Sequence, residues 1–302
     1  MLSDDLDRYF ALRRAVGFKL DIAERWLRRF ASFAAKRRER HVRIDTALEW
    51  AQSLSPTERK RRLEELAMFA RYARAEDPRH EVPDPTFFAI PAKTRRLPFI
   101  LGRADIRAIV GAASQLAPTG GMRPRSYATL FALLAATGMR IGEALRLRFT
   151  DYTSGGLTIR NTKFLKDRWI PLHPSTRAAL DAYLALRGRV AAETDHVFIS
   201  ERRKAFCNTN APLTVFQRIC RTLGLVRIDG PARLHDLRHT FAVRALERCR
   251  GDRFVIREHM VSLMTYLGHA CIASTYWYLH ATPSLMSGIA STTERHFRGG
   301  AS

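Results

Sequence analysis

His235-Asp236-Leu237-Arg238 is followed, in the last quarter of the chain, by Leu267-Gly268-His269 and then, nine residues after that histidine, by Tyr278. A tyrosine hydroxyl is a weak nucleophile until a neighbouring base and cationic donors activate it. This stretch supplies an arginine and two histidines beside the tyrosine, and such a set can support attack on a phosphodiester and hold the product as a covalent ester. The order of these residues therefore indicates a phosphate-cleaving site.

Two further cations precede this stretch. Arg140 lies in Thr137-Gly138-Met139-Arg140-Ile141-Gly142-Glu143, just before a short helix that is expected from Ile141. Lys163 lies between Leu157–Arg160 and Arg168–Leu172, two segments in which side chains alternate as they do in strands. The pattern predicts a β-hairpin with Lys163 just past its first strand.

Outside this hairpin the chain is patterned for helices. Residues 1 to about 80 read as consecutive amphipathic helices, and the clearest begins near Asp21 and is expected to turn one apolar face inward, formed by Ile22, Trp26, Phe30 and Phe33. A later helix has Ser55 as its N-cap and Pro56 in its first position, and it is expected to bury Leu63, Leu66 and Phe69. We therefore predict a mainly α fold with a small β-hairpin, an α+β architecture.

Prolines mark a boundary between two domains. Four of them occur at positions 83, 85, 91 and 98, where they interrupt any regular element. We expect an N-terminal helical domain over residues 1–82, a linker over 83–98 and a C-terminal domain over 99–302. In the latter, a helix is expected after Gly102, and a mostly apolar helix near residues 125–137 is expected to be buried.

The charge of the chain points to a polyanionic partner. Its 51 Lys and Arg outnumber its 29 Asp and Glu, which gives a formal net charge of +22, while 46% hydrophobic residues indicate a folded core. A solvated surface or a membrane-adhering face is the alternative explanation of this charge. The four cysteines show neither disulfide nor zinc spacing, and the sequence contains neither an apolar run of about 18 residues nor an export signal at its start, so we expect a cytoplasmic protein.

With these motifs, the chain resembles the tyrosine recombinases of the phage-integrase family over nearly its whole length. The weaker resemblance of Arg13–Lys19 and Tyr276–Leu279 is to the recombinases that transposon-like bacterial elements encode in groups. Matched onto this sequence, the catalytic residues of the family are Arg140, Lys163, His235, Arg238, His269 and Tyr278. The resemblance implies a two-domain clamp on double-stranded DNA and a site-specific recombinase that integrates or transposes DNA.

The family chemistry implies roles for four of these residues. Tyr278 forms a 3′-phosphotyrosine intermediate without metal or ATP, and the two arginines bind the phosphate, since a guanidinium offers a planar fork of donors. Lys163 protonates the leaving oxygen, and Glu143 orients Arg140. Sequential strand exchange implies a homotetramer on paired sites, formed with or without related recombinases. The tail after the nucleophile, residues 283–297, resembles the family's C-terminal helix that packs into a neighbouring subunit.

Several alternatives remain open from the sequence. Tyr276 competes with Tyr278, Lys166 competes with Lys163, and the tail could fold onto its own domain instead of a neighbour. His235 and His239 lie four residues apart and could mimic a metal pair, although no third ligand is indicated. At the level of function, a type IB-like topoisomerase, a plasmid or chromosome resolution recombinase and a non-catalytic DNA-binding regulator are the alternatives.

Overall fold

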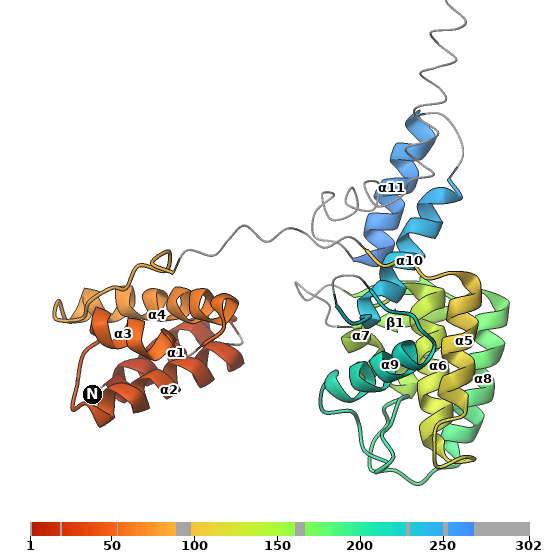
Figure 1. The fold of residues 1–302 in the computed structure, drawn as a ribbon, viewed down its shortest axis with the longest axis horizontal. Coiled ribbons are helices and arrows are strands. Elements are labelled where there is room, and N and C mark those ends of the chain that lie inside the picture. Colours follow the sequence, from red (N-terminus) through yellow and green to blue (C-terminus); the bar gives the residue numbers. More distant parts are fainter. Residues whose placement is uncertain are drawn as a thin grey trace, which may run out of the picture. The chain divides into compact units, whose positions relative to one another are not determined.

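The computed structural model describes residues 2–18, 20–52, 54–88, 98–160, 167–227, 230–249 and 253–268, and its contacts divide the chain into two units, Met1–Arg95 and Arg96–Ser302. Both units are built mainly from helices, and a two-stranded sheet lies in the second (Figure 1). The predicted fold class is therefore confirmed. None of the helices in the described ranges combines the length and the apolar character that a membrane crossing requires.

Within its described residues, the first unit contains four helices around one apolar core: α1 (Leu2–Ala15), α2 (Asp21–Lys36), α3 (Ile44–Gln52) and α4 (Pro56–Glu76). As predicted, Ser55 is the N-cap of α4 and Pro56 its first residue, where the missing N–H of proline costs no hydrogen bond. Leu63, Leu66 and Phe69 of this helix are fully buried. The buried face of α4 is thus the one that the sequence predicts.

The predicted inward face of α2 is wrong at one position. Ile22 is 58% exposed, whereas the buried face runs through Ala23, Leu27, Phe30 and Ala34. These four residues follow the i, i+4, i+7, i+11 spacing of a single helical stripe. Small alanines at both ends of the stripe carry little hydropathic signal, although they allow close approach to neighbouring helices.

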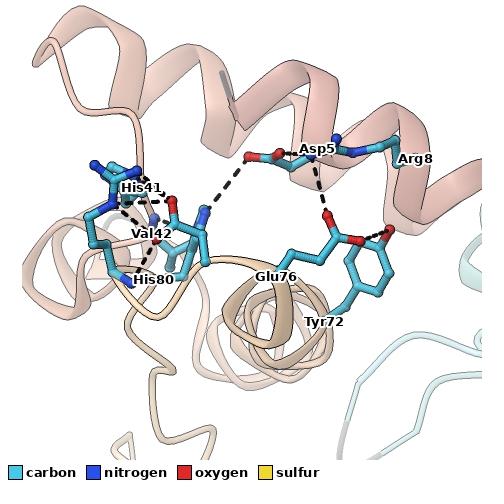
Figure 2. Close-up of polar contacts among 9 residues, drawn as sticks. Asp5, Arg8, His41, Val42, Tyr72, Glu76 and His80 are labelled. Carbon is cyan, nitrogen blue, oxygen red and sulfur yellow. Dashed lines mark hydrogen bonds and ion pairs between the residues drawn. The ribbon is translucent and has the colours of Figure 1, made fainter.

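A polar cluster ties α1 to the chain that follows α4 (Figure 2). His80 is 3% exposed, its Nδ1 accepts a hydrogen bond from the Val42 amide at 3.2 Å, and its Nε2 lies 3.8 Å from the Asp5 carboxylate. Arg8 and Tyr72 both contact Glu76 at the end of α4. The His80 ring is therefore held neutral, because a doubly protonated imidazole has no lone pair for the Val42 N–H.

His41, Asp77 and His80 also bring potential metal ligands within 4.8 Å of one another. These atoms have protein partners: His80 Nδ1 accepts from Val42, and Asp77 contacts His41 Nε2 at 3.2 Å and accepts from Arg79 at 2.8 Å. An ion would have to displace those bonds in a strongly cationic protein. We interpret the group as a hydrogen-bonded clasp between the segments that flank the core helices.

The second unit is arranged around α6 (Met122–Thr137), which packs against α5, α8 and α10. Its buried residues include Tyr127, Leu130, Phe131 and Leu134, which confirms the prediction of a buried apolar helix here. The other elements of this unit are α5 (Arg103–Ser114), α7 (Ile141–Arg146), the 3₁₀ turn η1 (Phe149–Asp151), β1 (Gly156–Ile159), β2 (Arg168–Pro171), α8 (Pro174–Gly188), α9 (Asn210–Thr222), α10 (Leu234–Glu247) and α11 (Arg253–Leu267).

The predicted hairpin is present as the antiparallel pair β1 and β2. Its register places Gly156 opposite Pro171 and Ile159 opposite Arg168. Leu157, Ile159 and Ile170 are buried, so the apolar face of the hairpin turns into the core of the unit. Cross-strand partners share a face, and Arg168 therefore points to the same side as these apolar residues.

Candidate active site

The first part of the site is a sharp turn between α6 and α7. Gly138 has φ +61°, a left-handed conformation that ends α6, and a Cβ at this position would lie 2.5 Å from the Phe241 ring. Only glycine satisfies both conditions. The turn redirects the chain so that Arg140 becomes the N-cap of α7.

Glu143 fixes Arg140 from one helical turn away. Its Oε2 accepts from the Arg140 backbone N–H at 2.9 Å and its Oε1 from Arg140 Nη1 at 2.9 Å. Arg168 of β2 donates to the same two oxygens, at 3.1 Å and 2.7 Å. Burial alone raises the pKa of Glu143, but the hydrogen bonds from Arg168 and Arg140 and the Arg168 charge outweigh it and lower that pKa to about 2.

Arg238 enters the site from α10. The residue is only 1% exposed, and it donates from Nη1 to the Gly138 carbonyl at 2.8 Å and from Nη2 to the Leu267 carbonyl at 2.7 Å. The start of α10 is itself fixed by Asp236, which accepts from the Arg233 amide at 2.7 Å. The α6–α7 turn, α10 and the end of α11 are thus joined through one guanidinium.

Three arginines from separate elements meet at the C-terminal end of α11. Three consecutive carbonyls, those of Tyr266, Leu267 and Gly268, accept hydrogen bonds from Arg168 at 3.0 Å, Arg238 at 2.7 Å and Arg140 at 3.0 Å, respectively. The last carbonyls of a helix have no partners within it and carry its negative dipole end, so cations are favoured there. The residue that follows Gly268 in the sequence is His269.

His235 and His239 extend the site along the first turns of α10. Their rings meet edge to face, with centroids 4.5 Å apart. Desolvation, followed by the charges of Arg238, Arg140 and Arg233, lowers the pKa of His235 to about 4. His235 is exposed to solvent, and the positive charges around it disfavour a second proton on its ring. The His235 imidazole is therefore neutral near pH 7.

A concave pocket of 440 Å³ opens beside these groups, and it is lined by residues of the α6–α7 turn, α7 and the start of α10: Met139, Arg140, Ile141, Gly142, Glu143, Arg146, Leu234 and His235. The Arg140 side chain is 33% exposed there, whereas the Glu143 side chain behind it is only 3% exposed. The accessible charge at this pocket is therefore positive, as a site for an anionic group requires.

The structure brings three of the six predicted site residues together. Arg140, Arg238 and His235 surround the α6–α7 turn and the start of α10. Lys163, His269 and Tyr278 lie outside the described residues, as do Tyr276, Lys166 and the tail. Arg168 was not singled out from the sequence, although one signal was available: it is a charged residue on the inward face of an otherwise apolar hairpin.

Comparisons with known proteins agree with this arrangement. The model of the phage integrase family matches residues 101–284, more than half of the chain. A Sinorhizobium fredii protein described as an integrase/recombinase, y4rB, is 35% identical over 97% of this chain and 96% of its own length.

Two solved structures share the fold at lower sequence identity. The Tn1549 transposon integrase in complex with transposon right end DNA is 16% identical, with a TM-score of 0.62 over 96% of this chain and 98% of its own. A lambda integrase tetramer bound to a Holliday junction is 20% identical, with a TM-score of 0.57 over 89% of this chain and 77% of its own. From the family match and the full-length relative, the chain belongs to the phage integrase family, the tyrosine recombinases that carry out site-specific recombination.

Proposed function

We propose that this chain cleaves and rejoins duplex DNA through a 3′-phosphotyrosine bond at Tyr278, with Arg140 and Arg238 binding the reacting phosphate. In cleavage, the Tyr278 hydroxyl loses its proton and its oxygen forms a bond to phosphorus as the bond from phosphorus to the 5′ oxygen breaks. Lys163 delivers a proton to that leaving oxygen. Rejoining reverses these steps with a 5′ hydroxyl from another strand, so the bond energy is conserved and no nucleotide is consumed.

Charge stabilisation is the task of the arginines. The pentacoordinate phosphorus carries extra negative charge on its non-bridging oxygens, and donors that are already oriented lower this barrier most effectively. Arg140 is held by Glu143 and by the Gly268 carbonyl, and Arg238 by two carbonyls, so both guanidiniums are already oriented before the substrate binds. His235 is neutral near pH 7, so it can serve as a hydrogen-bond donor or as a base for the tyrosine proton.

One observation carries this proposal above all. The guanidiniums of Arg140 and Arg238, which are 98 positions apart in the sequence, bond to the adjacent carbonyls of Gly268 and Leu267. This is the point of the backbone from which His269, and nine residues later Tyr278, continue. A convergence of this kind supports a single site for the family's six residues.

The first unit offers a basic surface for the same substrate. This surface contains a groove with a volume of 470 Å³. Its lining combines basic and aromatic side chains: Arg25, Arg28, Arg29, Lys36, Phe33 and Trp50. Lys and Arg side chains in such a groove neutralise phosphates along a duplex. We propose that the two units close on double-stranded DNA as a clamp.

We further propose that the chain works as a homotetramer on paired recombination sites in the bacterial cytoplasm, with the tail of residues 283–297 reaching a neighbouring subunit. The tetrameric lambda integrase supports this assembly. Integration or transposition is the role that we propose first, in keeping with the integrase names of the relative and of the Tn1549 protein. The comparisons do not favour the type IB-like topoisomerase alternative.

The proposal is tested with a suicide substrate, a nicked duplex that traps the covalent intermediate. Tyr278→Phe removes the nucleophilic oxygen and is expected to abolish the protein–DNA adduct while duplex binding is retained. Tyr276→Phe is the matched control, two residues away, and is expected to keep the adduct. An adduct that persists in Tyr278→Phe and disappears in Tyr276→Phe would assign the nucleophile to Tyr276 instead.

A further inference from the structure

The side chain of Arg168 connects β2 with two other elements of the site, α7 and the end of α11. It is the first residue of β2, opposite the buried Ile159, and its side chain is 11% exposed. All three guanidinium nitrogens donate: Nε to the Tyr266 carbonyl at 3.0 Å, and Nη1 and Nη2 to the two oxygens of Glu143 at 3.1 Å and 2.7 Å. A paired fork of this kind fixes both partners in direction as well as in distance.

Through Glu143, this fork reaches Arg140. Each oxygen of the carboxylate accepts one bond from Arg168 and one from Arg140, so the carboxylate bridges the two arginines. The Glu143 side chain is only 3% exposed, and the Arg168 hydrogen bond is the largest stabiliser of its charged form. Without Arg168, a buried carboxylate would keep only Arg140 to offset its desolvation.

Through Tyr266, the same side chain reaches the end of α11. Gly268 adopts φ +65°, and a Cβ on it would lie 3.0 Å from Arg168 Nη1. The guanidinium therefore occupies the place that a side chain at position 268 would need. This contact sets the backbone position directly before His269.

We propose that Arg168 is a positioning residue of the cleavage site: it aligns Arg140 through Glu143 and fixes the strand that follows Lys163 against the end of α11. This inference rests on the proposed function. In this role Arg168 acts through Glu143, and it links β2, the strand that follows Lys163 in the sequence, to Arg140.

The first test measures rates of adduct formation on the suicide substrate. Arg168→Met keeps an unbranched chain as far as the position of Nε and removes all the donors, and we expect the rate to fall by up to about 10²-fold, as small misplacements of catalytic groups do. Arg168→Lys restores a charge without the fork and is expected to recover only part of this loss. Arg148→Met is the matched control, because it removes a solvent-exposed pair with Asp195, and it is expected to leave the rate unchanged.

The coupling to Glu143 has its own signature. The Arg168→Met and Glu143→Gln losses are expected to overlap, so that the double variant is about as slow as the slower single variant. In Arg168→Met the pKa of Glu143 is expected to rise, so Glu143 becomes protonated at a higher pH than in the wild type. The rate of adduct formation should then fall on acidification in a pH range where the wild-type rate does not. This decline is expected to vanish when Glu143→Gln is added. Additive losses with parallel pH profiles would overturn the inference and leave Arg168 with a structural role only.

A spectroscopic measurement separates this inference from the proposed function. In the ¹⁵N-arginine-labelled full-length chain, the Arg140 Nε–H resonance, assigned by its loss in Arg140→Lys, is expected to move in Arg168→Met and to stay in place in Arg148→Met. A wild-type chain that forms no Tyr278-dependent adduct would overturn the proposed function alone. An Arg140 resonance that is unmoved in Arg168→Met would overturn the role of Arg168, whatever the chemistry.

Discussion

At the scale of single residues, the site depends on backbone conformations that one residue type allows. Gly138 combines a left-handed φ with a contact that excludes any Cβ, and its carbonyl accepts from Arg238. In the sequence, the Thr-Gly-Met-Arg segment indicates a functional role for Arg140. The structure shows that the glycine two residues earlier is what allows this arginine to cap α7.

Gly138→Ala should therefore destabilise the second unit. The left-handed conformation costs about 1–2 kcal/mol for a residue with a Cβ, and displacement of Phe241 adds to this loss. Gly111→Ala is the matched control: this glycine lies within α5 with open space around it, and alanine there should stabilise by roughly 0.5–1 kcal/mol. Urea unfolding of both variants measures the difference, and equal midpoints would contradict the account of the turn.

At the scale of elements, patterns that are local in the sequence were predictable and pairings across the chain were not. The start of α4 at Ser55-Pro56 and the hairpin of β1 and β2 follow from capping and alternation within a few residues. Arg168 could be assigned to a strand in the same way. Its bonds to Glu143 and Tyr266 depend on how β2, α7 and α11 pack, and no local pattern encodes that.

The same limit applies to the candidate site. The motifs nominated Arg140, His235 and Arg238, and the structure brings these residues together. The predicted face of α2 was wrong at Ile22 because large apolar residues outweigh alanines in a hydropathy pattern, whereas close packing favoured Ala23 and Ala34 over Ile22. The candidate site residues could therefore be predicted from the sequence, but the choice of which adjacent stripe of α2 is buried could not.

The clasp of His41, Asp77 and His80 predicts a pH dependence of stability. Burial, with a smaller contribution from His41 and Arg79, lowers the pKa of His80 below its usual value, and it outweighs the opposing effects of Asp5 and Asp77. The unfolded chain thus binds more protons, so this contribution to stability is present above about pH 6.5 and is lost as pH falls toward the folded-state value. His80→Asn retains an acceptor for the Val42 N–H without titrating, and its unfolding midpoint should change less between pH 7.5 and pH 5 than that of the wild type. A steeper change in the variant would contradict this account.

At the scale of the whole molecule, the excess of Lys and Arg over Asp and Glu predicts that duplex affinity depends strongly on salt concentration. A net charge of +22 makes counterion release a large part of duplex affinity. The logarithm of the association constant should fall linearly with the logarithm of salt concentration, with a slope of about −0.9 for each phosphate contacted. Fluorescence anisotropy on a labelled duplex measures the slope. Arg25→Ala, in the groove of the first unit, should remove one phosphate contact and so reduce the magnitude of the slope by roughly 0.9. A slope that is unchanged by this substitution would remove Arg25 from the DNA-binding surface.

The contacts of three arginines with the end of α11 also have a consequence for the folding of the nascent chain. The three carbonyls at the end of α11 belong to residues 266–268, so a nascent chain that has emerged only as far as α10 can form the contacts to Glu143 and Gly138 but lacks these three. Closing loops of about 30 to 130 residues must precede the full assembly of the centre, and such long-range closures come late in folding. The complete arrangement of the three guanidiniums is therefore expected only after α11 has been synthesised.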